Sequence, residues 1–362
     1  MEADSTGAVD LRAVQRDRRL DLLVVADSMR GGLGAAARAH AAWFADRGWR
    51  AGLVVPGVGE VATDAVQVLP SPELESAFQL RRLIQSARNL RRLLTERRPR
   101  VVHAHGTRSH LVCLLAGRRP YVTMHGTGGR IDGQTALGTA VRRASRPLAG
   151  RLAVRAYSVA PAGGRWQTLL HASPQLANLE LSDVPPSEVP MFLWVSRLEE
   201  PKQPESFIEA CAIAGRQHPL RGVILGDGPL IGSVRERVAE LGAPVDVLGS
   251  VADIGCYLRD ARAVVLLSGF EGVPFAIEEA MWVGRPVIVS PLPPLRWFAG
   301  EAARYARDAN ELAAAMIALT DVRTAAREGL AAAARVRSLL GEEAPFPQLL
   351  ADYRERFAIV DR

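Results

Sequence analysis

Lysine is almost missing from this sequence: of its 45 basic residues 44 are arginine, and Lys202 is the one lysine. Cysteine is scarce too. Only Cys113, Cys211 and Cys256 occur, far apart and each within an apolar segment. This spacing argues against a disulfide framework and against a cysteine metal site, and it predicts buried free thiols in a reducing compartment.

Long apolar runs are also missing. The longest, LVCLLAG at 111–117 and ARAVVLLSGF at 261–270, fall short of the ~18 residues that a membrane span needs. The first 19 residues carry charges where a secretory signal has a continuous apolar stretch. We therefore expect a globular, cytoplasmic protein.

Basic charge is plentiful, with a net charge of +6 and an isoelectric point near 9.8. Most arginines are spread along the chain, but residues 81–100 hold eight arginines against one glutamate, with apolar residues at helical spacing. The segment predicts an amphipathic helix with a basic outer face. A solvated helix face is the main interpretation, and contact with an anionic membrane surface or acceptor is the alternative. Nucleic acid is disfavoured because no aromatic residues are interleaved with the arginines.

Strand and helix signals alternate along the chain, and 362 residues suffice for two domains. Short apolar runs predict buried parallel strands at 20–27, 50–57, 100–106 and 120–126, and a second series at 191–196, 221–226, 243–249, 261–268 and 285–290. In the second half, helices are expected around 204–216, 230–241, 252–260 and 275–283.

The two series predict two Rossmann-like, doubly wound α/β domains facing across a cleft. A proline-rich stretch without periodicity at 178–190 is typical of a linker. The expected divisions are a flexible N-terminal tail, a first domain, a second domain and a closing amphipathic helix, at 1–18, 19–180, 190–340 and 345–362. In such sheets ligands bind at the carboxyl ends of the strands.

Two basic residues follow the strand at 191–196. Arg197 and Lys202 fit a diphosphate, because a guanidinium can bridge two oxygens while an ammonium acts as a mobile point charge. Pairing with nearby glutamates is the competing interpretation. The turn GDGPL, which contains Gly226, follows the next strand and fits either a purely geometric turn or part of the same site.

The most specific pattern is a pair of glutamates, Glu271 and Glu279, separated by seven residues. A helix is expected to start between them, so that the backbone amides of Val273, Pro274, Phe275 and Ala276, or those of them that carry a hydrogen, lie at its positive end. Two carboxylates beside such amides suit the hydroxyls of a sugar and a ribose on either side of a phosphate. Glu278 is expected to face solvent.

Histidines and arginines after strands in the first half are further candidates. We expect His103 and His105 on opposite faces of their strand, which disfavours a metal pair and leaves His103 a structural role. The acceptor-site candidates are His105, Arg108, His110 and Arg130. His125 follows a buried strand at a glycine turn, where a structural role is the default.

These motifs together resemble the retaining glycosyltransferases of family 4, which have the GT-B fold. The resemblance covers about residues 20–360. It implies that Arg197 and Lys202 neutralise the donor diphosphate, that Glu279 binds the ribose, and that Glu271 holds the transferred sugar. It also implies that Gly31 and Gly32 form the glycine loop that approaches the diphosphate and acceptor. His125 would then lie beside the donor sugar, and the helix at 346–360 would cross back onto the first domain.

The resemblance implies transfer of a hexose-type sugar from a nucleoside-diphosphate sugar, with UDP preferred, to a hydroxyl of a small metabolite, glycolipid or polysaccharide precursor. No cofactor or metal is expected, since no Asp-x-Asp motif occurs. Two departures leave the donor sugar and acceptor open: EGVPFA stands where EGFGL is commoner, and no glutamate follows the glycine loop. A nucleotide-sugar epimerase or hydrolase on the same fold is the alternative, and a non-catalytic nucleotide-sugar binder is a third hypothesis.

Overall fold

The computed structural model describes residues 19–28, 31–56, 67–71, 80–126, 150–185, 188–341 and 344–357. Contacts divide the chain into two compact units. The first consists of Met1–Val122, Leu152–Arg155 and Tyr353–Arg362, and the second of Thr123–Arg151 and Ala156–Asp352. None of the described helices is long and apolar enough to cross a membrane.

The first sheet has seven strands in the order β3-β2-β1-β4-β5-β6-β7. They are β1 (Leu22–Ala26), β2 (Ala51–Pro56), β3 (Gln67–Ser71), β4 (Val101–His105), β5 (Tyr121–Met124), β6 (Ala156–Ser158) and β7 (Trp166–Thr168). The helices of this half and of the C-terminus are α2 (Gly31–Ala45), α3 (Leu80–Arg97), α4 (Thr107–Leu115) and α13 (Phe346–Phe357). Strands β1 and β4 are buried throughout; β1 is a continuous apolar run, as expected for a strand covered on both faces, whereas β4 also buries His103 and His105.

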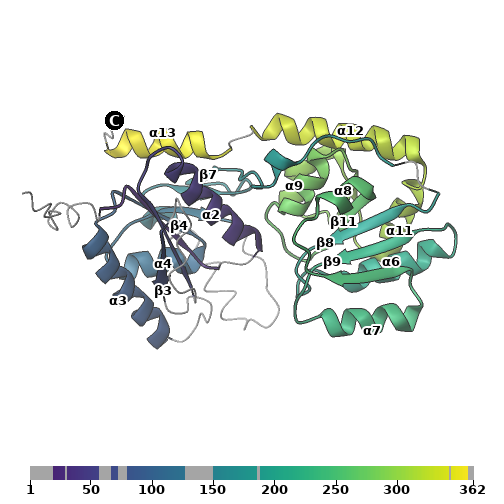
Figure 1. Cartoon of the computed structure of the whole chain (residues 1–362), viewed down its shortest axis with the longest axis horizontal. Coiled ribbons are helices and arrows are strands. Elements are labelled where there is room, and N and C mark those ends of the chain that lie inside the picture. The colour runs from purple at the N-terminus through teal and green to yellow at the C-terminus, as the bar shows by residue number, and fades with distance from the viewer. Residues whose placement is uncertain are drawn as a thin grey trace, which may run out of the picture. The chain divides into compact units, whose positions relative to one another are not determined.

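The second sheet has six strands in the order β10-β9-β8-β11-β12-β13. They are β8 (Met191–Val195), β9 (Arg221–Leu225), β10 (Val245–Gly249), β11 (Ala261–Leu266), β12 (Val287–Val289) and β13 (Arg304–Tyr305). The helices are α6 (Pro204–Gly215), α7 (Ile231–Leu241), α8 (Gly255–Asp260), α9 (Phe275–Trp282), α10 (Pro293–Ala299), α11 (Ala309–Ala318) and α12 (Val322–Leu339). Helices α9 and α12 cover one side of the sheet and α6 the other (Figure 1).

Both strand orders contain the pattern 3-2-1-4-5-6, which is that of the dinucleotide-binding Rossmann fold. The prediction of two doubly wound α/β units is therefore confirmed. In this pattern the order reverses between β1 and β4 in the first sheet and between β8 and β11 in the second. The loops after those strands are where such folds bind ligands.

Several elements had no prediction from the sequence. Strands β3, β6, β7 and β13 have the sequences QVLPS, AYS, WQT and RY, none of which contains the continuous apolar run by which the other strands were predicted. Cys256 also differs from expectation. Cys113 and Cys211 are buried, but Cys256, in the first turn of α8, is exposed, while Gly255 and Leu258 are the buried residues of that helix.

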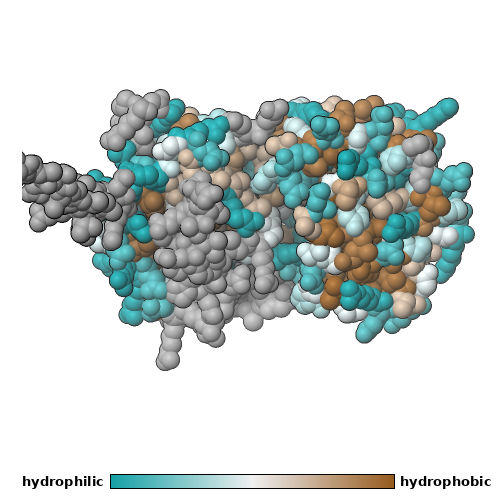
Figure 2. All heavy atoms as spheres, in the orientation of Figure 1, coloured by the Kyte–Doolittle hydropathy of each residue, from teal (hydrophilic) through white to brown (hydrophobic). Residues whose placement is uncertain are grey.

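Helix α3 confirms the predicted helix at 81–100. Ala87 and Leu90 are 5% and 4% exposed, while Arg88, Arg91 and Arg92 are exposed. Arg92 forms an i,i+4 ion pair of 2.8 Å with Glu96. In Figure 2 hydrophilic residues gather at the lower left, where Figure 1 places α3. The outer side of the helix is thus basic and solvated.

Three histidines and Tyr353 of α13 form a buried cluster in the first unit. The Tyr353 hydroxyl lies 2.5 Å from His103 Nδ1 and 3.2 Å from His40 Nε2, and His40 Nδ1 lies 2.9 Å from His105 Nε2. The His103 and His105 rings stack with centroids 4.9 Å apart. Placing these two on opposite faces was wrong, because residues two apart on a strand share a face.

Two buried arginines hold the irregular segment at 179–185 in place within the second unit. Arg285, which is fully buried, donates to the carbonyl oxygens of Ser182, Asp183 and Leu258 at 2.8–2.9 Å. Arg262 donates to the carbonyl oxygen of Pro185 at 3.0 Å. The irregular segment at 179–185 is therefore held through its backbone, since it lacks a periodic apolar face to bury.

Candidate functional site

Lys202 and Glu271 meet at the point where the second sheet reverses its order. Lys202 lies in the loop after β8 and Glu271 in the loop after β11, and β8 and β11 are neighbours. Lys202 Nζ forms an ion pair with Glu271 Oε1, and the two side chains are only 14% and 6% exposed. Two of the predicted site residues, 69 positions apart, are thus in direct contact.

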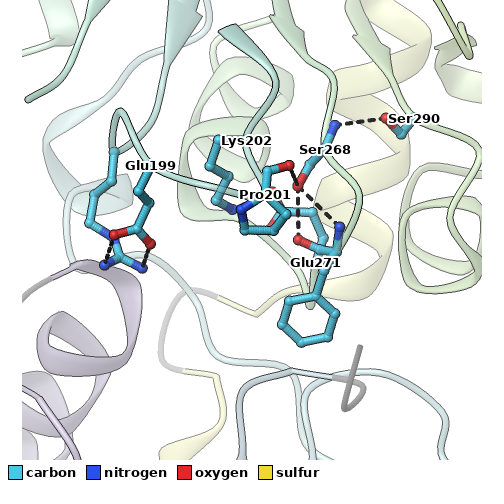
Figure 3. A network of polar contacts seen from close by, with 8 residues as sticks. Glu199, Pro201, Lys202, Ser268, Glu271 and Ser290 are labelled. Atoms are coloured by element: carbon cyan, nitrogen blue, oxygen red, sulfur yellow. Dashed lines mark hydrogen bonds and ion pairs between the residues drawn. The ribbon is translucent and has the colours of Figure 1, made fainter. Parts of the chain in front are cut away.

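A hydrogen-bond network fixes the two loops against each other (Figure 3). The Ser268 hydroxyl lies 3.2 Å from the carbonyl oxygen of Pro201, and the Gly269 N–H donates to the same oxygen at 2.9 Å. The Ser268 N–H donates to the Ser290 hydroxyl at 2.8 Å. Because Pro201 and Ser268 precede Lys202 and Glu271 closely, the network positions the ion pair through the backbone.

Arg197 does not contact Glu271 through any hydrogen bond or ion pair found among the described residues. Its guanidinium binds Glu199 with two contacts, of 2.8 and 2.6 Å, and its side chain is 54% exposed. The sequence interpretation in which Arg197 pairs with a neighbouring glutamate is confirmed. A surface pair of this kind contributes little to stability, so an anion of higher charge can compete for the guanidinium.

Gly226 and Gly228 are explained by close backbone packing. A Cβ on Gly226 would lie 1.8 Å from the carbonyl oxygen of Ser196, and one on Gly228 would lie 2.3 Å from that of Leu198. Both residues have φ near +150°, a region that side chains disfavour. The turn therefore supports the loop that carries Arg197 and Lys202, as the geometric interpretation predicts.

Helix α9 starts where the glutamate spacing predicts, between Glu271 and Glu279. It begins at Phe275 after Pro274, whose carbonyl oxygen accepts from the N–H groups of Ile277 and Glu278 at 3.0 and 3.2 Å. The N–H groups of Phe275 and Ala276 have no intrahelical acceptor by position. They are left at the positive end of the helix, together with that of Val273, for an anion.

Glu278 and Glu279 are both buried, at 0% and 4% exposed. The expectation that Glu278 faces solvent was wrong. Helix α9 lies against β11 and β12 and is also covered by α12, so it has no solvated side. Glu278 Oε2 accepts from the Ser173 N–H at 2.9 Å, and Glu279 Oε1 accepts from the Ser173 hydroxyl.

Burial raises the pKa of both carboxyl groups. For Glu279 the pKa rises to about 7, because burial outweighs the hydrogen bond from Ser173. For Glu278 burial raises the pKa well above the ordinary value, opposed by the Ser173 N–H and reinforced by the nearby Glu279 charge. Glu278 Oε1 is buried and has no hydrogen-bond partner among the described residues. A neutral carboxyl tolerates this better than a carboxylate.

The raised pKa of Glu278 predicts a stability change with pH. Below about pH 4.5 the carboxyl is protonated in folded and unfolded chains alike, so its contribution is fully present. As the pH rises, the unfolded chain loses this proton first and the folded state loses stability. Glu278→Gln removes this loss. Above about pH 4.5 we therefore expect the unfolding free energy of the variant, relative to that of the parent protein, to rise by up to about 1.4 kcal/mol per pH unit.

Urea unfolding at pH 5, 6, 7 and 8 measures this difference. Glu355→Gln, at a side chain that is 72% exposed, is the control and should give a flat difference. A flat difference for Glu278→Gln would contradict a protonated Glu278.

His125 lies beside a second histidine. Its ring centroid is 5.1 Å from that of His171, which follows β7 and is 2% exposed. Burial lowers the pKa of His125 to about 4, so the imidazole is neutral near pH 7. Its carbonyl oxygen would lie 2.1 Å from a Cβ on Gly272. This close approach brings the His125 loop to the Glu271 loop and explains the glycine.

The other first-half candidates lie in the first unit. Gly31, with φ of +64°, and Gly32 are exposed and begin α2, so the expected glycine loop is part of a helix start. Arg108 is in the first turn of α4, where Asp27 accepts its N–H at 3.2 Å. His110 is 3% exposed, its Nε2 is buried without a partner in the described structure, and burial lowers its pKa to about 4.

Two candidates remain. His105 is fully buried and bonded to His40, as described above. Arg130 lies outside the described residues.

Sequence reasoning missed Ser173 and His171. Both follow the three-residue strand β7, WQT, which lacks an apolar run. Their position at the carboxyl end of a strand was the available signal, but it requires the strand to be recognised first.

Family models match both halves of the chain. Glycosyltransferase Family 4 matches residues 30–161, and Glycosyl transferases group 1 matches residues 189–321. The second match contains Arg197, Lys202, Glu271 and Glu279.

Relatives share part of the sequence. The chain is 33% identical over 129 residues to the Vi polysaccharide biosynthesis protein VipC/TviE of Salmonella typhi, covering 30% of this chain and 22% of that protein. It is 32% identical over 94 residues to GalNAc-alpha-(1->4)-GalNAc-alpha-(1->3)-diNAcBac-PP-undecaprenol alpha-1,4-N-acetyl-D-galactosaminyltransferase of Campylobacter jejuni, covering 25% and 26%. The match thus spans about a quarter of these relatives' length.

A solved structure shares the fold. HepE of Anabaena, in complex with UDP and glucose, superposes with a TM-score of 0.73 over 94% of this chain and 100% of that chain, at 16% identity. At this identity the likeness establishes the architecture alone.

Proposed function

Because this chain belongs to the GT-B glycosyltransferases, with a family 4 and a group 1 domain, we propose that it transfers a hexose-type sugar from a nucleoside-diphosphate sugar to a hydroxyl group with retention of configuration. The observation that carries the proposal is the buried contact between Lys202 and Glu271 beside the start of α9. At one strand end, a cation and helix amides suit the diphosphate of such a donor, and a carboxylate suits the hydroxyls of its sugar.

Each part of the donor has a proposed partner. Lys202, Arg197 and the amides from Val273 to Ala276 bind the diphosphate, because they supply two positive charges and a helix dipole. Glu271 accepts hydroxyls of the transferred sugar, and Glu279 accepts the ribose hydroxyls. Neutral His125 lies close to the Glu271 loop and can donate or accept at the sugar.

The proposed reaction needs no resident cofactor. The C1–O bond of the donor breaks through an oxocarbenium-like state, and its electron pair passes to the diphosphate. The acceptor oxygen bonds to C1 on the same face, and its proton passes to the leaving diphosphate oxygen. Lys202 and Arg197 stabilise the charge that develops on the diphosphate, so we expect turnover to persist when a chelator is present.

The proposed donor nucleotide is UDP, and the proposed acceptor is a hydroxyl of a growing glycan. HepE of Anabaena is seen with UDP and glucose. The two relatives are named for polysaccharide biosynthesis and for addition to an undecaprenol-linked glycan. The exposed arginines of α3 are compatible with an acceptor held at an anionic membrane surface.

A thermal-shift panel with UDP-, GDP-, ADP- and TDP-sugars tests donor binding. We expect a Tm rise of several degrees with UDP-sugars and little with the others, because a ligand bound only by the folded state stabilises it by RT ln(1 + [L]/Kd). Product analysis then follows with a glycan acceptor, where the anomeric configuration should be retained. An altered nucleotide sugar or free sugar with no acceptor consumed would instead indicate an epimerase or hydrolase.

A further inference from the structure

Ser173 makes two contacts with the paired glutamates of α9. Its N–H donates to Glu278 Oε2 at 2.9 Å, and its hydroxyl bonds to Glu279 Oε1. It lies in the loop after β7, is 4% exposed, and is more than 100 positions from either glutamate. We propose that Ser173 is a positioning residue for nucleotide binding, whose hydroxyl holds the Glu279 carboxylate in the orientation that accepts the ribose hydroxyls. This inference rests on the proposed function.

The direction of the hydroxyl bond follows from its surroundings. The Gln175 N–H lies 3.3 Å from Ser173 Oγ and uses it as an acceptor. An ionised Glu279 can only accept, so the Ser173 O–H donates to it. No other hydrogen bond to Glu279 occurs among the described residues beyond those of its helix backbone. One carboxylate oxygen is therefore fixed by Ser173, and the other is left for a ligand.

The same bond favours the charged form of Glu279. Burial raises the pKa of Glu279 to about 7, and the Ser173 hydrogen bond opposes that rise. Burial also raises the pKa of Glu278, the other titratable group at Ser173, which favours its neutral form. Near pH 7 the population of ionised Glu279 therefore depends on Ser173. The ionised form accepts two ribose hydroxyls more strongly than a neutral carboxyl does.

Ser173→Ala isolates the hydroxyl. The variant keeps the N–H that binds Glu278 and loses the two contacts of the hydroxyl, the bond to Glu279 and the longer one from the Gln175 N–H. Ser338→Ala is the matched control, because the Ser338 hydroxyl donates at 2.7 Å to a carbonyl oxygen on α12, where it is exposed. Glu279→Gln is the reference for losing the ribose contact itself.

Calorimetric titration with two probes tests the inference, using UDP and inorganic diphosphate, which lacks the ribose. We expect Ser173→Ala to weaken UDP binding about tenfold, which corresponds to about 1.4 kcal/mol, while diphosphate binding changes less than twofold, because the lost hydrogen bond is to a charged group. The acid limb of UDP binding should also move to higher pH, and Ser338→Ala should match the parent protein.

Four results would overturn the inference, and they differ in whether the proposed function survives them. If Ser173→Ala weakened the binding of UDP and of diphosphate equally, Ser173 would support the loop fold and would not act through Glu279. Unchanged UDP affinity in Ser173→Ala, with weak binding in Glu279→Gln, would leave the proposed function intact and remove the role of Ser173. Unchanged binding in Glu279→Gln, or no binding by the parent protein, would remove the ribose role and the inference with it.

Discussion

Lys202→Ala is expected to lower turnover about 10²–10³-fold, the size of effect seen when one preorganised electrostatic donor is removed. Lys202 is largely buried, and the Glu271 carboxylate fixes its ammonium group. Its loss also leaves Glu271 buried without its cation, so a lower Tm is expected as well. Turnover is therefore measured at a temperature where circular dichroism shows every variant folded.

Lys202→Arg separates charge from shape. It keeps the positive charge but replaces a compact, flexible ammonium with a planar fork, in a place where the lysine side chain is 14% exposed. We expect an intermediate loss of about tenfold. Arg307→Ala, at a side chain 70% exposed, is the control and should retain parental turnover. Near-normal turnover in Lys202→Ala would contradict the proposed role of this residue.

Arg285→Ala is expected to destabilise the protein by about 3–5 kcal/mol, or roughly 10 °C in Tm. Arg285 donates to carbonyl oxygens at the end of α8, including those of Leu258 and Arg259, and to the Ser182 hydroxyl at 2.6 Å. Burial lowers its pKa to about 10, which leaves it charged at neutral pH. Removing it leaves a cavity and several buried carbonyl oxygens without donors.

Arg221→Ala is the control for that experiment. Its side chain is 54% exposed and pairs with Asp246 at 2.7 Å, an arrangement typically worth less than about 1 kcal/mol. Urea unfolding followed by fluorescence measures both variants. If Arg285→Ala cost no more than Arg221→Ala, its hydrogen bonds would not be what holds the segment at 179–185.

Some site residues could be predicted because their signal is local. Glu271 and Glu279 are eight positions apart around a helix start, and Lys202 follows a buried strand directly. Such signals depend on strand ends and helix starts, which apolar runs and turn residues mark in one dimension. The closing helix α13 was likewise predicted from its amphipathic spacing, although the partners of Tyr353 were not.

Other features depend on which elements are packed together. Glu278 is fully buried and bonds to Ser173, and the contact of Ser173 with both glutamates joins residues 105 and 106 positions apart. Nothing in a local pattern encodes either approach. The doubly wound architecture could be predicted from local patterns, because short apolar runs that alternate with helical segments are typical of a parallel sheet covered on both faces. Which polar groups lose water together could be seen only in the folded chain, since burial and pairing depend on neighbours that are distant in the sequence.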